Sequence, residues 1–152
     1  QRQMCIRDRC RMINLYPKKC NLCGGKVIYT SNCRIYGKEY GSGKCYYCTE
    51  CGGYVGTHVP RPREALGILA DQEMRELKKR CHVIFDGFWE NEKTSRKRHI
   101  VRQQCYRTMA DLLGLQRNEC HFGYFDKETL ITAMKILESG KFRAELQAHM
   151  DL

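Results

Sequence analysis

Apolar residues recur at helical spacing through the second half of the chain. After Asp71, they follow one another at intervals of three and four, which predicts an amphipathic helix capped by Asp71. Ser95 is the expected cap of a second such helix that ends at Gly114, and Asp126 is the expected cap of a third that ends before Gly140. The expected inward positions are Met74, Leu77, Cys81, Ile84, Phe85 and Phe88 in the first helix, Val101, Cys105, Met109, Leu112 and Leu113 in the second, and Leu130, Met134 and Leu137 in the third.

The first half of the chain has short β-prone stretches separated by glycines. Val27–Thr30, Cys33–Tyr36 and Lys44–Tyr47 are rich in Val, Ile and Tyr, the residues that favour strands. They predict strands joined by glycine-containing turns. A small sheet followed by three helices is an α+β fold.

A short pattern occurs twice around these strands. Cys20-Asn-Leu-Cys23-Gly-Gly is echoed by Cys48-Thr-Glu-Cys51-Gly-Gly. Two cysteines at this spacing let one tight turn present two sulfurs to one ion, and two such turns complete the four thiolates of a closed, structural zinc site. The glycines let backbone amides approach the sulfurs and offset their negative charge. The pattern predicts a zinc ribbon that carries one structural Zn²⁺, with no open position for catalysis.

Other assignments of the cysteines compete with this one. Cys45 and Cys48 also form a Cys-x-x-Cys pair, but only Cys48 and Cys51 are followed by Gly-Gly. His58 is a further ligand candidate, although four thiolates already complete the site. Buried free cysteines or disulfides are the alternative to a metal, and the repeated pattern argues against them.

Composition narrows the class of protein. The chain has 152 residues and 11 cysteines, an odd number, and no run approaches the roughly 18–20 apolar residues that span a bilayer. No apolar signal-peptide core is present near the first residue. We therefore expect no membrane association and a reducing, cytoplasmic location. A ribbon of this size has too small a core to hold itself without metal.

Positive charge is concentrated in the ribbon segment. The net charge is +10, and residues 1–63 hold 12 Lys and Arg against 3 Asp and Glu. This excess suggests a polyanionic partner, and tyrosines interleaved with basic residues suggest base stacking beside phosphate contacts. About half of the tyrosines should instead face the core of the ribbon. The candidate nucleic-acid contacts in this segment are Lys26, Arg34, Tyr36, Lys38, Tyr40, Lys44 and Tyr46.

A second basic stretch lies in the helical half. Lys93–Arg107 contains no acidic residue, and the helical spacing places Arg98 and Arg102 on one face. It is a second candidate phosphate surface, or simply a solvated helix face. The candidate contacts here are Arg96, Lys97, Arg98 and Arg102.

The expected domain organisation has four parts. Residues 1–11 are expected to be a non-native or disordered extension, because QRQMCIRDR resembles the translation of a sequencing-adaptor read and Met12 follows as a start. Residues 12–59 form the ribbon, 60–70 a proline-containing connector, and 71–152 the helical unit. The end of the chain, from Lys141, is left open between a short helix and a frayed tail.

Two Cys-His dipeptides offer the only candidates for catalysis. His82 follows Cys81 and His121 follows Cys120, but their spacing matches no metal-ligand or nucleophile pattern. Structural histidines are the better interpretation. We expect no enzyme activity, with a nuclease that uses His82 and His121 as the weaker alternative.

The order of motifs resembles a known family. CxxCGG is followed by IYGKEYG, CxxCGGYVGTH, LGILAD, RELKKRCHVIFDGFW, CYRTMADLLGL and ECHFGYFD. From about Cys20 to Leu137 the chain resembles the phage and prophage "zinc-finger-containing domain" family, whose function is unknown. The first unit alone is similar to the zinc ribbons of bacterial type I topoisomerases, which bind single-stranded DNA. Cys33, Cys45 and Cys81 stand where family members commonly have small or polar residues, which weakens them as ligand candidates.

The resemblance implies the four-cysteine zinc site and a phage origin in a bacterial host cell, but no activity. The charge and aromatic patterns favour binding of single-stranded or structured DNA or RNA without catalysis. A protein partner is the alternative from another class. The chain would then inhibit or assist a nucleic-acid-guided effector nuclease, in the manner of an anti-CRISPR protein.

Overall fold

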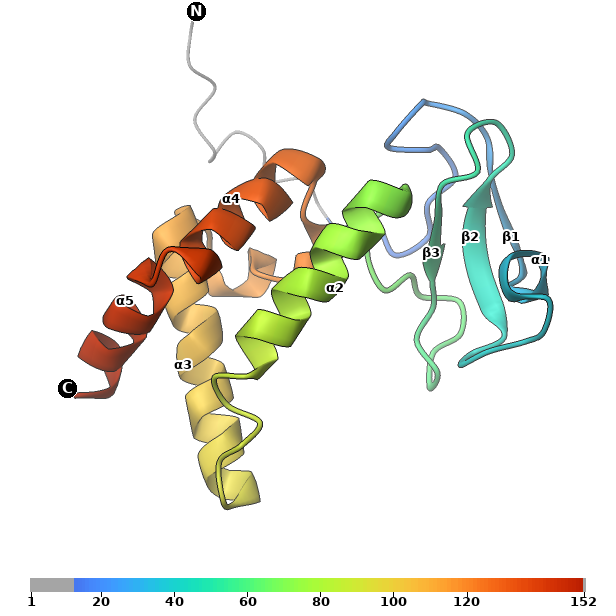
Figure 1. Ribbon diagram of the computed structural model, residues 1–152. Helices are drawn as coiled ribbons and strands as arrows, with labels where there is room; N and C mark the ends of the chain where they lie inside the picture. Colours follow the sequence, from blue (N-terminus) through green and yellow to red (C-terminus); the bar gives the residue numbers. More distant parts are fainter. Residues whose placement is uncertain (1–12, 152) are drawn as a thin grey trace, which may run out of the picture. The chain divides into compact units, whose positions relative to one another are not determined.

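The computed structural model describes residues 13–151, so the predictions for residues 1–11 lie outside the described residues. The chain divides into two compact units. Of the described residues, the ribbon unit holds 13–75 together with Gly123–Asp126, and the helical unit holds Glu76–Phe122 and 127–151 (Figure 1). The predicted α+β class is confirmed.

The ribbon unit is built on a three-stranded antiparallel sheet. Its strands are β1 (Val27–Ser31), β2 (Lys44–Cys48) and β3 (Tyr54–Gly56), in the order β1-β2-β3. The register pairs Tyr29 with Tyr46 and Tyr46 with Val55, so these side chains share one face. The other face carries the residues that alternate with them. β3 was not expected from the sequence, because it has only three residues.

One face of the sheet carries the core of the ribbon unit. Val27, Tyr46 and Cys48 pack there with Ala65 and Leu69 in one buried cluster. The segment from residue 60 to 70, expected as a connector, is bound to the sheet by backbone hydrogen bonds. They run from Leu66 N to Gly56 O at 2.9 Å and between Tyr54 and Ala70 in both directions, at 3.0 and 3.2 Å.

The prediction of a strand over Cys33–Tyr36 is wrong, because this segment is the short helix α1. The buried Asn32 reverses the chain here: its amide donates to Tyr40 O at 2.6 Å and its Oδ1 accepts from Tyr40 N at 3.1 Å. Gly37 ends the helix in a left-handed conformation, with φ of 73°. These contacts favour a compact turn over the extended backbone that the β-prone composition suggests.

The helical unit contains more helix than expected. α2 (Gln72–Asp86), α3 (Ser95–Leu113) and α4 (Lys127–Glu138) match the three predicted helices, and α5 (Lys141–Met150) occupies the segment left open. The 3-10 helices η2 (Arg117–Glu119) and η3 (Phe122–Tyr124) lie between α3 and α4. Among the residues that the structure describes, no helix is both long enough and apolar enough to cross a bilayer.

The predicted cap of α2 is confirmed and that of α3 shifts by one residue. Asp71 Oδ1 accepts from Met74 N at 2.8 Å. For α3 the cap is Thr94, not Ser95: Thr94 is extended and its side chain accepts from Lys97 N at 3.2 Å. Two adjacent hydroxyl residues suit this role equally, so only the backbone angles distinguish them.

The core of the helical unit is centred on Phe85, which is fully buried. Its ring centroid lies 4.8 Å from that of Tyr106 on α3, 5.2 Å from Phe122 and 5.8 Å from Phe142 on α5. α3 packs against α4 and α5, and α4 packs against α5. Most of the apolar positions read from the sequence are buried, and Leu77, Ile84, Phe88 and Leu112 are half-buried.

Candidate metal centre

The two Cys-x-x-Cys-Gly-Gly turns have the same backbone geometry. In the first, Cys20 N donates to Gly25 O at 2.8 Å and Gly24 N to Cys20 O at 2.9 Å. In the second, the bonds from Cys48 N to Gly53 O and from Gly52 N to Cys48 O measure 2.8 and 3.1 Å. The first glycine of each turn is left-handed, with φ of 78° at Gly24 and 76° at Gly52, which strongly favours glycine there.

These turns bring four sulfur atoms together at one end of the sheet. The Sγ atoms of Cys20, Cys23, Cys48 and Cys51 all lie within 4.8 Å of one another. Cys20 Sγ is 3.7 Å from Cys51 Sγ, and Cys23 Sγ is 3.5 Å from Cys48 Sγ. Sulfurs bound tetrahedrally to one zinc at about 2.3 Å lie about 3.8 Å apart, whereas a disulfide needs about 2.05 Å. The donor set therefore fits Zn²⁺ and excludes a disulfide in this arrangement.

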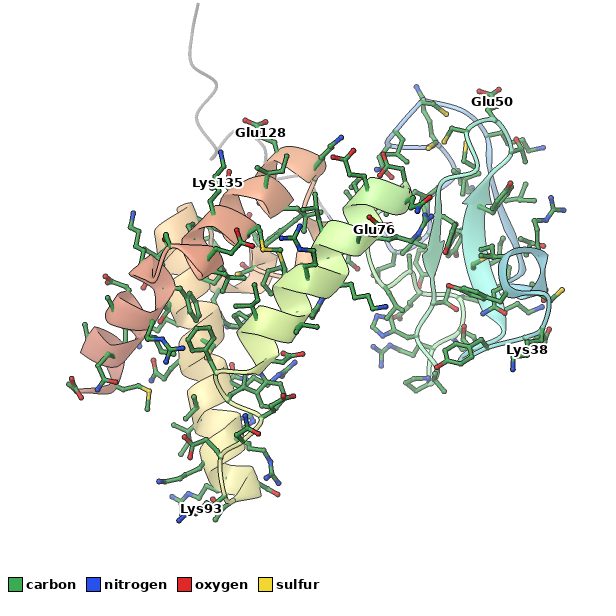
Figure 2. The ribbon with its side chains drawn as sticks, in the orientation of Figure 1. Lys38, Glu50, Glu76, Lys93, Glu128 and Lys135 are labelled. Atoms are coloured by element: carbon green, nitrogen blue, oxygen red, sulfur yellow. The ribbon has the colours of Figure 1, made fainter. Side chains whose placement is uncertain are left out.

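Backbone amides surround the sulfurs. Leu22 N lies 3.3 Å from Cys20 Sγ, Gly25 N 3.3 Å from Cys23 Sγ, and Gly53 N 3.4 Å from Cys51 Sγ. Such donors offset the excess negative charge that four thiolates leave around one divalent cation. Figure 2 shows sulfur atoms gathered at the end of the sheet that carries Glu50, with Lys38 at the opposite end.

The protonation of the thiols depends on the same contacts. The Cys51 amide lowers the pKa of Cys48 to about 7, although burial opposes this shift. The Gly53 amide acts in the same direction on Cys51, but burial and the neighbouring thiols of Cys23, Cys48 and Cys20 together raise the pKa of Cys51 to about 12. Crowding these thiols without a cation therefore disfavours ionisation of Cys51, and a divalent ion reverses this preference.

A polar clamp connects the first turn to the segment that follows β3. Asn21 Nδ2 donates to Leu69 O at 2.9 Å, and Leu69 N donates to Asn21 Oδ1 at 2.9 Å. Leu69 is fully buried in the core of the ribbon unit. The zinc turn and the core thus support each other through one amide side chain, which the sequence analysis did not single out.

The competing ligands are not at the site. Cys45 lies in β2, three residues before Cys48, and strand alternation places these two side chains on opposite faces. His58 is half-buried and is not in the sulfur cluster. Within residues 13–151, the four cysteines are the only group of three or more potential ligands that could hold a metal.

Comparison with known families agrees with this site. The sequence pattern that defines the "zinc-finger-containing domain" family matches residues 16–140. The chain belongs to this family. The match covers both zinc turns and extends through α4, so the family includes most of the helical unit as well as the ribbon. No curated protein and no solved structure matches the chain.

The four-cysteine cluster and the zinc-finger family together support one structural zinc, with Cys20 and Cys48 buried and Cys23 and Cys51 exposed. In each turn, the first cysteine faces the core and the second faces solvent. Zinc therefore holds the turns at the margin of the sheet, where the ion closes the fold without lying deep inside it.

The structure disperses the ribbon residues that we predicted to contact nucleic acid. Arg34, Tyr36, Lys38 and Tyr40 lie together in α1 and the turn after it, and all four are exposed. Lys26 is exposed beside the first zinc turn, and Lys44 is half-buried at the start of β2. Tyr46 is only 7 % exposed, and its hydroxyl donates to Arg63 O at 2.6 Å.

The second predicted group lies along α3. Arg96 and Lys97 are exposed in its first turn, and Arg98 is half-buried, with Nη1 2.9 Å from Glu92 O. Arg102 is also half-buried, with its guanidinium carbon 5.3 Å from the centre of the Trp89 ring and 5.0 Å from that of Tyr106.

His82 and His121 each lie beside an aromatic ring of the helical unit. His82 Nδ1 lies 2.8 Å from Lys78 O, and its ring packs 5.0 Å from Phe122. The centroid of His121 lies 6.0 Å from that of Tyr106. Burial lowers the pKa of His121, and the nearby cations Arg117 and Arg102 lower it further.

Proposed function

We propose that the ribbon unit binds single-stranded or structured nucleic acid through one face of its sheet, without catalysis. This tyrosine–arginine face consists of Arg34, Tyr36, Tyr40, Tyr47, Tyr54 and Arg75. It lies on the side of the sheet opposite the buried cluster around Tyr46. Its main support is a group of neighbouring tyrosine rings, of which Tyr36 and Tyr40 are exposed, with arginine guanidinium groups packed on the half-buried rings of Tyr47 and Tyr54.

The rings and the guanidinium groups of this face lie close to one another. Tyr36 lies 6.2 Å from Tyr40 and 6.2 Å from Tyr54, measured between ring centroids. The guanidinium carbon of Arg34 is 5.3 Å from the centre of the Tyr47 ring, and that of Arg75 is 4.1 Å from the centre of Tyr54. Stacked guanidinium groups keep their charge and their N–H donors, so they remain able to bind phosphate.

The exposure of the rings favours stacking with unpaired bases. Tyr36 is 52 % exposed and Tyr40 is 71 % exposed, and Lys38 lies between them in sequence. Partial burial and the neighbouring Tyr54 raise the pKa of Tyr36 to about 12, so this ring carries no negative charge at neutral pH. Exposed rings beside cations are the arrangement that single-strand binders use.

The zinc site supports this face directly. Tyr47 and Tyr54 lie next to the second zinc turn, one residue before Cys48 and one after Gly53. A side-chain carbon added at Gly52 would lie 3.5 Å from the Tyr47 hydroxyl. The metal therefore holds the strands whose tyrosines form the face, although it does not touch the ligand.

The test is binding of labelled oligothymidine and oligouridine to the full zinc-loaded chain, followed by fluorescence anisotropy. Tyr36→Ala and Tyr40→Ala should each weaken binding by about 1–3 kcal/mol, the usual contribution of a ring stacked on a base. Tyr16→Ala is the matched control, because Tyr16 is also 52 % exposed but is not part of the face. Affinity should fall steeply between about 50 and 200 mM salt.

Two results would contradict the proposal. One is the absence of oligonucleotide binding at low salt by a chain that contains zinc and has a native circular dichroism spectrum. The other is equal affinity of the Tyr36→Ala, Tyr40→Ala and Tyr16→Ala variants. A complex with a protein partner that survives nuclease treatment would then favour a protein-binding role.

A further inference from the structure

The helical unit contains a basic hollow on its surface. The hollow has a volume of about 340 Å³ and is lined by Gln103, Gln104, Arg107 and Arg117. The first three residues come from the later turns of α3. Arg117 comes from η2, after the chain has reversed at Gly114, which is left-handed with φ of 68°.

Contacts to α3 hold Arg117 in place at the hollow. Its Nη2 donates to Gln103 Oε1 at 3.0 Å, and its guanidinium carbon lies 4.4 Å from the centre of the Tyr106 ring. Arg102 contacts the same ring at 5.0 Å. Two guanidinium groups thus share one aromatic ring, so part of the entropic cost of ordering them for a ligand is already met.

The arginines of this cluster have no close acidic partner. Among the described residues, Arg102, Arg107 and Arg117 form no ion pair within 4.0 Å. The acids nearby in sequence have other contacts: Asp86 accepts from Trp89 Nε1 at 3.0 Å, Glu119 from Gln116 N at 3.0 Å, and Asp111 lies 3.7 Å from His149 Nε2.

The charge of these arginines affects the pKa of the neighbouring His121. The cations Arg117 and Arg102 add to burial in lowering the pKa of His121, as a positive potential requires. Like charges held close together repel each other, and a bound anion removes that repulsion. Arginine forks match the oxygens of phosphate, and glutamine side chains add neutral donors beside them.

We propose that this hollow binds a phosphate group of the nucleic-acid backbone, with Arg107 and Arg117 as its charged contacts. The inference rests on the proposed function and adds a second contact site that the ribbon does not contain. The same chemistry would accept a phosphate from a free nucleotide, which the experiment distinguishes.

The test compares two doubly substituted full-length chains in the oligonucleotide assay. Arg107→Gln with Arg117→Gln removes the two charges of the hollow. Arg80→Gln with Lys135→Gln removes two exposed charges elsewhere on the helical unit. The plot of log affinity against log salt should become shallower by about 0.7 for the hollow variant, the change expected when a single-strand binder loses one phosphate contact. The control should keep the wild-type slope.

Arg107→Gln alone separates binding from folding. The Arg107 side chain makes no hydrogen bond or ion pair with the described residues, so its replacement breaks no polar contact within them. This variant should weaken binding more than Arg80→Gln does. Equal slopes and affinities for the hollow and control variants, with wild-type binding intact, would overturn this inference alone. Absence of oligonucleotide binding by the wild type would overturn the proposed function and this inference together.

Inorganic phosphate identifies the source of the ligand. Titrated into the full chain, it should shift the ¹⁵N–¹H signals of Gln103, Arg107 and Arg117 and compete with the oligonucleotide. If phosphate shifts these signals but the hollow variant binds oligonucleotide as the control does, the hollow takes a free phosphate and the backbone contact is wrong.

Discussion

At the residue scale, Asn21 connects the metal site to the core. It occupies the first variable position of the first Cys-x-x-Cys turn. The nitrogen and the oxygen of its side-chain amide both form hydrogen bonds with the backbone of the buried Leu69. Thr49 stands at the matching position of the second turn and donates hydrogen bonds to Lys26 O instead, from its backbone N at 3.0 Å and from its hydroxyl at 3.2 Å. The repeated turns thus attach to different parts of the ribbon through their variable residues.

Asn21→Ala should destabilise the ribbon unit by about 1–2 kcal/mol, because it leaves a buried backbone amide and carbonyl without their partners. Urea unfolding followed by near-ultraviolet circular dichroism of the tyrosines measures the loss. Asn91→Ala is the matched control: Asn91 is exposed, has no hydrogen bond to the described residues, and should change stability by less than about 0.5 kcal/mol. Equal midpoints for the two variants would show that the clamp contributes nothing.

At the element scale, a short segment from between the helices completes the ribbon unit. Gly123–Asp126 is about fifty residues from the rest of that unit in sequence, yet Ile68 N donates to Gly123 O at 2.9 Å and Tyr124 Oη lies 3.3 Å from Ala65 O. The two backbones meet at Gly67 and Gly123. A side-chain carbon at Gly67 would lie 2.0 Å from Gly123 O, so neither position has room for one.

Gly67→Ala should therefore destabilise the protein by about 1–3 kcal/mol, since backbone must move to admit the methyl group. Differential scanning calorimetry of the zinc-loaded chain measures this as a lower Tm. Gly56→Ala is the control, because its added carbon would make an ordinary contact of 3.5 Å with Leu66 Cδ1. A Tm for Gly67→Ala at or above that of Gly56→Ala would contradict the close approach.

At the scale of the whole molecule, zinc and protons compete for the same four sulfurs. Hydrogen bonding among the thiols and burial raise the pKa of Cys23 above its ordinary value despite the opposing Gly25 amide, and the pKa of Cys51 is about 12. Both thiols are protonated near neutral pH when no cation is present. Zinc must displace at least these two protons, so low pH favours the metal-free chain and high pH favours the zinc-bound chain.

The apparent zinc affinity should therefore fall by at least about a hundredfold for each pH unit of acidification near neutrality, because at least two protons are exchanged for one ion. Competition with a chromophoric chelator at pH 6, 7 and 8 measures this dependence. Tyrosine circular dichroism should be lost with the metal, since the core of the ribbon is small. Trp89, the single tryptophan, lies in the helical unit and reports on that unit separately. An affinity independent of pH would exclude thiol protonation from the binding equilibrium.

Local sequence patterns were sufficient to predict the metal site and the long helices. The chelating turn is encoded within six residues, so Cys20 and Cys23 could be identified as ligands without any knowledge of the fold. The apolar spacing of the helices was equally informative, since Phe85, Cys105 and Leu130 are all fully buried, as their positions in the pattern required. The caps of α2 and α3 were predicted to within one residue, and the error at α3 arose because Thr94 and Ser95 both carry a hydroxyl that can cap a helix.

Contacts between distant residues could not be predicted in this way. Alternation indicated that about half of the ribbon tyrosines face inward, but only the register shows that Tyr46 is buried while Tyr47 faces the other side. Arg75 and Arg117 were not singled out, because each meets its aromatic partner through a chain reversal. Binding of nucleic acid by the tyrosine–arginine face and by the hollow stays a prediction, which the oligonucleotide experiments test.

The sequence by itself determined the zinc ligands and the helical faces, because a chelating turn and an amphipathic helix are both set by interactions within a few residues. Only the tertiary structure decided that Cys33–Tyr36 is a helix, that Gly123–Asp126 joins the ribbon unit, and which tyrosines and arginines meet on exposed surfaces. These outcomes depend on pairings between segments far apart in the chain. Their free energies come from packing and hydrogen bonds that no short window of sequence contains.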